Sequence, residues 1–174
     1  QLEVEPSKTQ LIEFGRFAAR DAAARGGRPE TFDFLGFTHY CGQTRYGAFK
    51  VKRMTSKKKF RAKLQAVKLW LREERNRLKT GELLGRGKQL LAGHLQYYAI
   101  TDNGKMCEEF RRQVARQLFK WLNRRSQRRS YTWERFNDAL AWVQWPSVRM
   151  QHKLDPFRRG APRWHRVQQI AFCF

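Results

Sequence analysis

Lysine and arginine side chains form a nearly continuous run through the middle of the chain. The run consists of Lys50, Lys52, Arg53, Lys57, Lys58, Lys59, Arg61, Lys63, Lys68, Arg72, Arg75, Arg77 and Lys79. Solvated surfaces usually mix both signs of charge because like charges repel one another. A second cluster, Arg124, Arg125, Arg128 and Arg129, offers forked donors that suit phosphate oxygens. We therefore expect both groups to bind a polyanion.

The overall composition also predicts a globular protein that binds nucleic acid. The 174 residues include 37 Lys and Arg against 15 Asp and Glu, a formal net charge of +22, which opposes a compact state unless a polyanion binds. Unlike a disordered basic tail, the chain contains 13 Phe, 6 Trp and 5 Tyr. Tyr97 and Tyr98 can stack on bases, but adjacent helical residues face different ways, so we expect one of the two in the core.

Groups that carry out catalysis or bind metals do not gather in the sequence. A two-metal phosphoryl-transfer site needs converging carboxylates, whereas the aspartates are scattered. The pairs Glu73-Glu74 and Glu108-Glu109 fall among arginines and are interpreted as ion-paired, solvated side chains. The histidines show no metal-binding spacing. We expect no catalytic residue, cofactor or metal in this chain.

The sequence predicts an intracellular location. Cys41, Cys107 and Cys173 are far apart and without ligand spacing, which favours reduced, apolar side chains in a cytoplasmic or organellar protein that is not secreted. No apolar run approaches the roughly 20 residues of a membrane-spanning helix, so no membrane partner is expected. The chain begins at Gln1 in the middle of a strand pattern and without a leader, and we interpret it as a fragment.

The first third of the chain has the pattern of β-structure. Two segments rich in aromatic and β-branched residues, 31–40 and 48–54, predict a hairpin, in which Gly42 and Gly47 of the connector supply positive φ. Residues 1–14 are expected to form two short extended runs, and residues 16–29, rich in Ala, Arg and Gly, a loop.

From residue 55 onward, apolar residues recur at helical offsets. A first helix runs on as far as Leu78, residues 82–87 interrupt the pattern, and a second helix ends near Thr101. A third helix follows, and a shorter fourth helix stops at Pro146. The expected caps are Thr55 or Ser56, Asp102 or Asn103, and Thr132. The fold class is therefore α+β, with short strands and a β-hairpin followed by a mainly α-helical bundle.

Four motifs carry a resemblance to a known family. They are residues 2–9 (LEVEPSKT), 32–37 (FDFLGF), 93–98 (GHLQYY) and 119–127 (FKWLNRRSQ). In this order they resemble the C-terminal part of a group II intron reverse transcriptase/maturase. The resemblance implies the end of a palm with a primer-grip hairpin at 1–54, a helical thumb or maturase (X) domain at 55–154, and an irregular basic tail at 155–174.

The resemblance also implies roles for individual residues. Lys8 would lie near the leaving pyrophosphate, where it donates a proton or supplies a charge; a charge at a strand edge is the alternative. The primer grip would be Phe34, Leu35, Gly36 and Phe37. The helix from Lys57 to Arg75 would follow RNA by its shape and backbone, and His94 joins Tyr97 and Tyr98 as an RNA-binding residue.

The implied partners are intron RNA, an RNA/DNA template-primer, and the missing fingers and palm of the same polypeptide. The catalytic aspartates precede Gln1 in the family, so this chain alone is predicted to be inactive, and Mg²⁺ is expected for the complete polymerase only. The implied function is support of intron splicing and reverse transcription. The alternative from a different class is a non-catalytic basic RNA-binding protein of a ribonucleoprotein.

Overall fold

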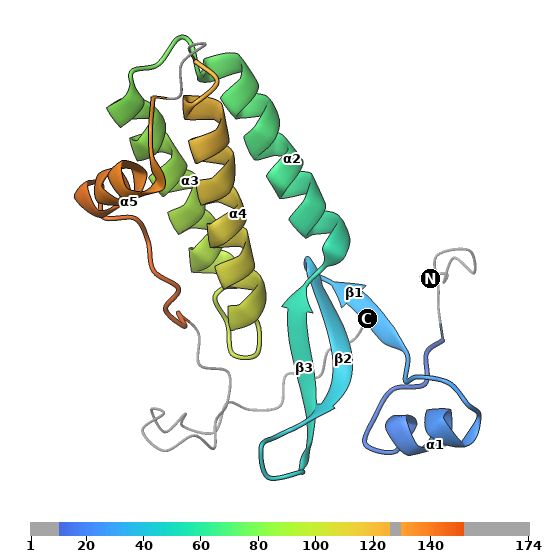
Figure 1. Ribbon diagram of the computed structural model, residues 1–174. Coiled ribbons are helices and arrows are strands. Elements are labelled where there is room, and N and C mark those ends of the chain that lie inside the picture. Colours follow the sequence, from blue (N-terminus) through green and yellow to red (C-terminus); the bar gives the residue numbers. More distant parts are fainter. Residues whose placement is uncertain (1–10, 126–129, 152–174) are drawn as a thin grey trace, which may run out of the picture.

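The computed structural model joins a three-stranded antiparallel sheet to a bundle of helices, as expected for the α+β class (Figure 1). The structure describes residues 11–125 and 130–151. Residues 1–10 of the expected extended segment 1–14, which include Lys8, lie outside the described residues, as do Arg128, Arg129 and the tail 155–174.

The segment 16–29 contains a short helix, so the prediction of a loop was wrong there. Helix α1 spans Ala18–Ala24, with Ala18 and Ala22 buried. Alanine has the highest helix propensity of all residues. Gly26, with φ 72°, follows the end of the helix, and Gly27 N donates to the carbonyl of Ala22. The glycines therefore end the helix and do not prevent it.

The sheet is a meander of three strands. They are β1 (Thr31–Phe34), β2 (Phe37–Gln43) and β3 (Phe49–Thr55), and β2 pairs with both neighbours. The hairpin of β2 and β3 was predicted, but residues 31–40 do not form one strand, because the chain reverses at Leu35 and Gly36. Both residues have positive φ, 47° and 80°, as in a type I′ turn. Gly47 has the expected positive φ, whereas Gly42 lies within β2.

Among the described residues, four helices follow the sheet: α2 (Lys57–Glu74), α3 (Thr80–Tyr98), α4 (Gly104–Leu122) and α5 (Trp133–Trp142). The break between the first two lies at 75–79 and not at 82–87. Lys79 N donates to the Glu82 carboxylate, which caps the start of α3. Gly87 lies within α3 and does not end it. A Cβ at this position would lie 3.1 Å from Leu118 of α4, so the glycine allows the two helices to pack closely.

The core lies between the helices. Its fully buried side chains include Leu71 of α2, Leu91 of α3, Phe110 of α4 and Phe136 of α5. The expected cap of α5 is confirmed, because Thr132 accepts a hydrogen bond from Arg135 N. Trp133, at the start of α5, is 43% exposed, and its ring stacks on that of Phe119 at 4.0 Å.

Asn103 fixes the sheet to the bundle. Its side chain is fully buried, and it accepts a hydrogen bond from Thr55 N at 2.7 Å while donating to Thr55 Oγ1 and to the Tyr98 carbonyl, each at 2.8 Å. Asn103 occupies the predicted cap position of α4, but its side chain makes no capping hydrogen bond. It bonds the end of β3 to the end of α3 and thereby sets the direction in which α2 leaves the sheet.

Candidate nucleic-acid interface

Four cations form a line along α2. Lys57, Arg61, Lys68 and Arg72 follow one another at spacings of four, seven and four residues, which place them on one side of a helix, and all four are exposed. We call this set the α2 stripe. The helix begins directly after β3 and runs along the outside of the bundle (Figure 1).

The α2 stripe lacks neutralising acids. No Asp or Glu occurs between Lys57 and Arg72 in the sequence. The ion pairs found among the described residues lie elsewhere: Glu74 is 3.6 Å from Arg77 and 4.0 Å from Arg86, and Glu108 is 2.8 Å from Arg111. The stripe therefore presents uncompensated positive charge, which attracts an anionic polymer.

The cations of β3 have different surroundings. Lys50 is ion-paired with Asp102 at 3.2 Å and is largely buried. Arg53 lies partly buried beside His39, where burial first and the charge of Arg53 second lower the pKa of that imidazole. Lys50 therefore belongs to the contact between the sheet and the bundle, whereas the residues of the α2 stripe are exposed.

At the far end of the bundle, two arginines flank one indole ring. The Arg75 guanidinium lies 4.7 Å from the Trp121 ring centroid and that of Arg124 lies 5.5 Å from it. Both distances are typical of cation–π contacts. Arg124 is exposed and Arg75 is partly buried, so Arg124 is the one with donors free to face solvent.

The Arg125 side chain forms hydrogen bonds within the protein. Its guanidinium donates to the carbonyl oxygens of Arg75 and Leu78 and, at 3.0 Å, to Thr80 Oγ1. These acceptors belong to the end of α2, the connection and the start of α3. Arg125 therefore holds the turn between the two helices, and its donors face the protein and not solvent.

The motif at 93–98 divides between core and surface. His94 is 1% exposed, and its ring stacks on Phe110 at 3.7 Å and on Tyr98 at 4.5 Å. Burial, with a smaller effect of Lys63, lowers the pKa of His94 from 6.5 to about 4. Tyr98 is buried and Tyr97 is 50% exposed, the division expected for adjacent helical residues. In this conformation Tyr97 alone of these three presents a ring to solvent.

Residues 34–37 form the tight turn between β1 and β2. Phe34 and Leu35 are exposed, and Phe37 is buried against Tyr98 at 5.1 Å. Tyr97 donates to the Leu35 carbonyl at 2.8 Å, and a Cβ at Gly36 would lie 2.8 Å from Tyr98 Oη. The C-terminal end of α3 therefore supports a turn that projects two apolar side chains.

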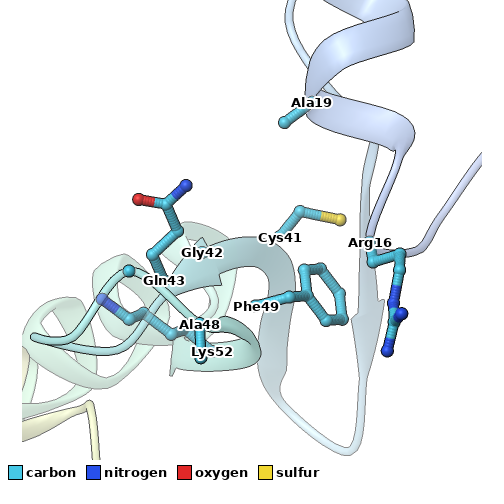
Figure 2. A pocket seen from close by; sticks show the side chains of 9 residues that line it. Arg16, Ala19, Cys41, Gly42, Gln43, Ala48, Phe49 and Lys52 are labelled. Atoms are coloured by element: carbon cyan, nitrogen blue, oxygen red, sulfur yellow. The ribbon is translucent and has the colours of Figure 1, made fainter.

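A cleft between α1 and the β2–β3 hairpin was not predicted from the sequence. It has a volume of about 730 Å³, and Figure 2 shows its lining side chains, among them Phe49 and Arg16. Gln43 and Phe49 are direct cross-strand partners, so their side chains leave the same face of the hairpin. Because side chains alternate between the two faces of a strand, the predicted hairpin could have placed Gln43 and Phe49 on one face. No feature of the sequence predicted that Arg16 lies at the same cleft.

The described residues were compared with the requirements of a metal site and of a membrane-spanning helix. Across 11–125 and 130–151, no group of three or more His, Cys, Asp and Glu side chains is placed to hold a metal ion. None of the helices in this part of the chain is long and apolar enough to cross a membrane.

The helical part of the chain was compared with known protein families. Residues 57–139 match the family model of the group II intron, maturase-specific domain. This part of the chain is therefore similar to a group II intron maturase-specific domain. The domain indicates a function in group II intron splicing. No curated protein and no solved structure matched the chain.

The maturase-specific domain begins at the first residue of α2 and extends into α5. The α2 stripe, His94, Tyr97 and the two arginines at Trp121 therefore lie within it. The turn at 34–37 and the cleft lined by Phe49 precede it in the chain. The bonds of Asn103 connect these two parts.

Proposed function

We propose that the chain binds group II intron RNA through the α2 stripe in support of splicing, and that it is the C-terminal part of an intron-encoded reverse transcriptase. One observation carries the proposal: the first helix of a maturase-specific domain presents a line of exposed cations without ion pairs among the described residues. The exposed Arg124 adds positive charge at the far end of the bundle.

The geometry of the stripe suits a nucleic-acid backbone. At 1.5 Å per residue, Lys57 and Arg72 are separated by roughly 22 Å along the helix. Lysine and arginine neutralise phosphates and release counterions, which favours binding without regard to base sequence. Structured RNA is recognised largely by shape and through its backbone. The stripe would accordingly supply affinity, and the arrangement of the folded intron would supply specificity.

Template-primer binding is a finer part of the same proposal. The turn at 34–37 would meet a primer strand through its backbone and the exposed side chains of Phe34 and Leu35, beside the exposed ring of Tyr97. Gly36, which bears no side chain, permits a close approach. Lys8 near the leaving pyrophosphate and Mg²⁺ bound by the catalytic aspartates belong to this proposal for the complete polymerase.

Competition binding tests the proposed function. The full chain would be bound to a labelled group II intron RNA in the presence of Mg²⁺, and unlabelled intron RNA would be compared with an unrelated structured RNA of the same length. We expect intron RNA to compete at least tenfold more strongly. Equal competition by the two RNAs would favour a general basic protein of a ribonucleoprotein over a maturase.

Two variants assign the binding to a surface. The first replaces the α2 stripe with alanine at all four positions. The matched control removes the same charge from exposed positions on α4 and α5, at Lys105, Arg116, Lys120 and Arg135. We expect the stripe variant to lose far more affinity for intron RNA than the control. An equal loss in both variants would mean that total charge, and not the stripe, determines binding.

A further inference from the structure

The cleft between α1 and the hairpin combines the groups that recognise an unpaired nucleotide. The Phe49 ring is 39% exposed, and the side chain of Gln43, its cross-strand partner, leaves the same face of the hairpin and also lines the cleft. Arg16, in the turn before α1, lines the same cleft (Figure 2). Aromatic rings stack on bases, amides bond to base edges, and guanidinium groups bind phosphates or stack in their turn.

The charge of the lining favours an anionic ligand. Its nine residues include the cations Arg16 and Lys52 and no acid. The stem of Lys52 runs along Gly42, where a Cβ would lie 2.7 Å from Lys52 Cδ, so the glycine leaves room for that side chain. A volume of about 730 Å³ is in the range of sites for small organic groups, and an open, cationic and aromatic cleft suits one nucleotide of a longer strand.

The walls of the cleft are held in place by contacts that do not occupy it. The Cys41 thiol donates to the Gly15 carbonyl at 3.5 Å, and the Phe14 ring meets Phe32 at 5.0 Å. Glu13 N donates to the Glu30 carboxylate at 2.7 Å. These contacts join the segment before α1 to the sheet, so that Arg16 remains beside the hairpin.

We propose that this cleft binds an unpaired nucleotide of a bound RNA, with its base stacked on Phe49 and its phosphate at Arg16. The proposal rests on the RNA binding proposed above but concerns a different surface, because the cleft precedes the maturase-specific domain in the chain. The α2 stripe would hold the backbone of structured RNA, while the cleft would select RNA that carries a single-stranded segment at the correct distance.

The test compares two RNA probes and two aromatic substitutions. One probe is an intron-derived stem-loop with a blunt end. The other is the same stem-loop with an overhang of five unpaired nucleotides at its 3′ end. We expect the full chain to bind the second probe about tenfold more tightly, as one base stacked on an aromatic ring allows. Phe49→Ala should abolish this preference while binding of the blunt probe is unchanged. Trp142→Ala, which removes a 78% exposed aromatic ring on α5, should keep the preference.

The outcomes separate the two proposals. If neither probe binds, the proposed RNA-binding function fails; if both bind equally well to the unsubstituted chain, only the cleft proposal is overturned. Retained binding of the blunt probe shows that Phe49→Ala folds, and Gln43→Ala and Arg16→Ala give the same comparison at exposed positions. Photocrosslinking of 5-iodouridine in the overhang should label the peptide that contains Phe49. Labelling confined to other peptides would contradict the assignment.

Discussion

Replacing His94 with phenylalanine should remove an acid-sensitive contribution to folding. His94 is 1% exposed between the rings of Phe110 and Tyr98, and neither ring nitrogen has a hydrogen-bond partner among the described residues. The imidazole is therefore buried in its neutral form, and desolvation is the main reason that its pKa is about 4. Phenylalanine preserves an aromatic ring of similar size without a titrating group.

The sign and the magnitude of the effect follow from linkage. Between pH 6.5 and pH 4 the unfolded chain binds a proton at this histidine and the folded chain does not, so stability falls as the pH falls through this window. The difference between a pKa of 6.5 and one of about 4 corresponds to a loss of about 3 kcal/mol. Above pH 6.5 the folded state retains this contribution in full.

Urea unfolding monitored by circular dichroism would be measured at pH 7, 6, 5 and 4.5 for both proteins. The two proteins differ at residue 94 alone, so the difference between their stabilities isolates the contribution of His94. We expect His94→Phe to be at least as stable as the unsubstituted chain at pH 7 and to lose less stability by pH 4.5. Parallel losses in the two proteins would refute the reasoning that His94 is buried and neutral.

Three further substitutions test the contacts that position the interface, each by urea unfolding. Gly36→Ala should cost about 2 kcal/mol, because it combines positive φ with a contact 2.8 Å from Tyr98 Oη; Gly47→Ala, with the same φ in open space, should cost less, and equal costs would argue against the contact. Asn103→Ala should cost about 3 kcal/mol, because it leaves Thr55 N buried without its acceptor, and a cost near zero would show that the junction does not depend on this amide. Arg125→Lys should cost about 2 kcal/mol, since an ammonium group cannot reproduce the fork to two carbonyls and Thr80. An unchanged urea midpoint for Arg125→Lys would mean that these hydrogen bonds do not stabilise the fold. Arg125 would then again be a candidate RNA-binding residue.

Periodicity predicted the helices whose apolar residues repeat without interruption. Phe110, Val114 and Leu118 recur every four residues and are fully buried in α4. The prediction of a break at 82–87 was wrong, because Gly87 lies within α3 and packs against Leu118 of α4. This contact is between two helices and leaves no local signal in the sequence. Helix α1 was missed because the glycines that end it were read as evidence against it.

The turn at Leu35 and Gly36 depends on contacts distant in sequence. Leucine is unfavourable at positive φ, so the pattern 31–40 gave no reason to expect a reversal at Leu35. The structure supplies the reason, because the hydroxyl groups of Tyr97 and Tyr98 support the turn from α3. Such a contact spans 62 residues of the chain and has no local signal.

The candidate site could be predicted only where it depends on residues close together in the sequence. A run of cations without acids is a local feature, so the α2 stripe could be predicted. His94 and Arg125 have functional-looking residue types, but their burial and partners come from other helices. The cleft at Phe49 joins segments more than thirty residues apart, since Arg16 precedes α1 and Phe49 begins β3.

The salt dependence of intron RNA binding tests the central claim most directly. Log affinity should fall linearly with log salt concentration, at about 0.7 to 0.9 per phosphate neutralised. Replacing all four residues of the α2 stripe with alanine should therefore reduce the slope by about 3, while the control at Lys105, Arg116, Lys120 and Arg135 changes it little. A slope that is unchanged in the stripe variant would contradict the claim that this side of α2 binds RNA.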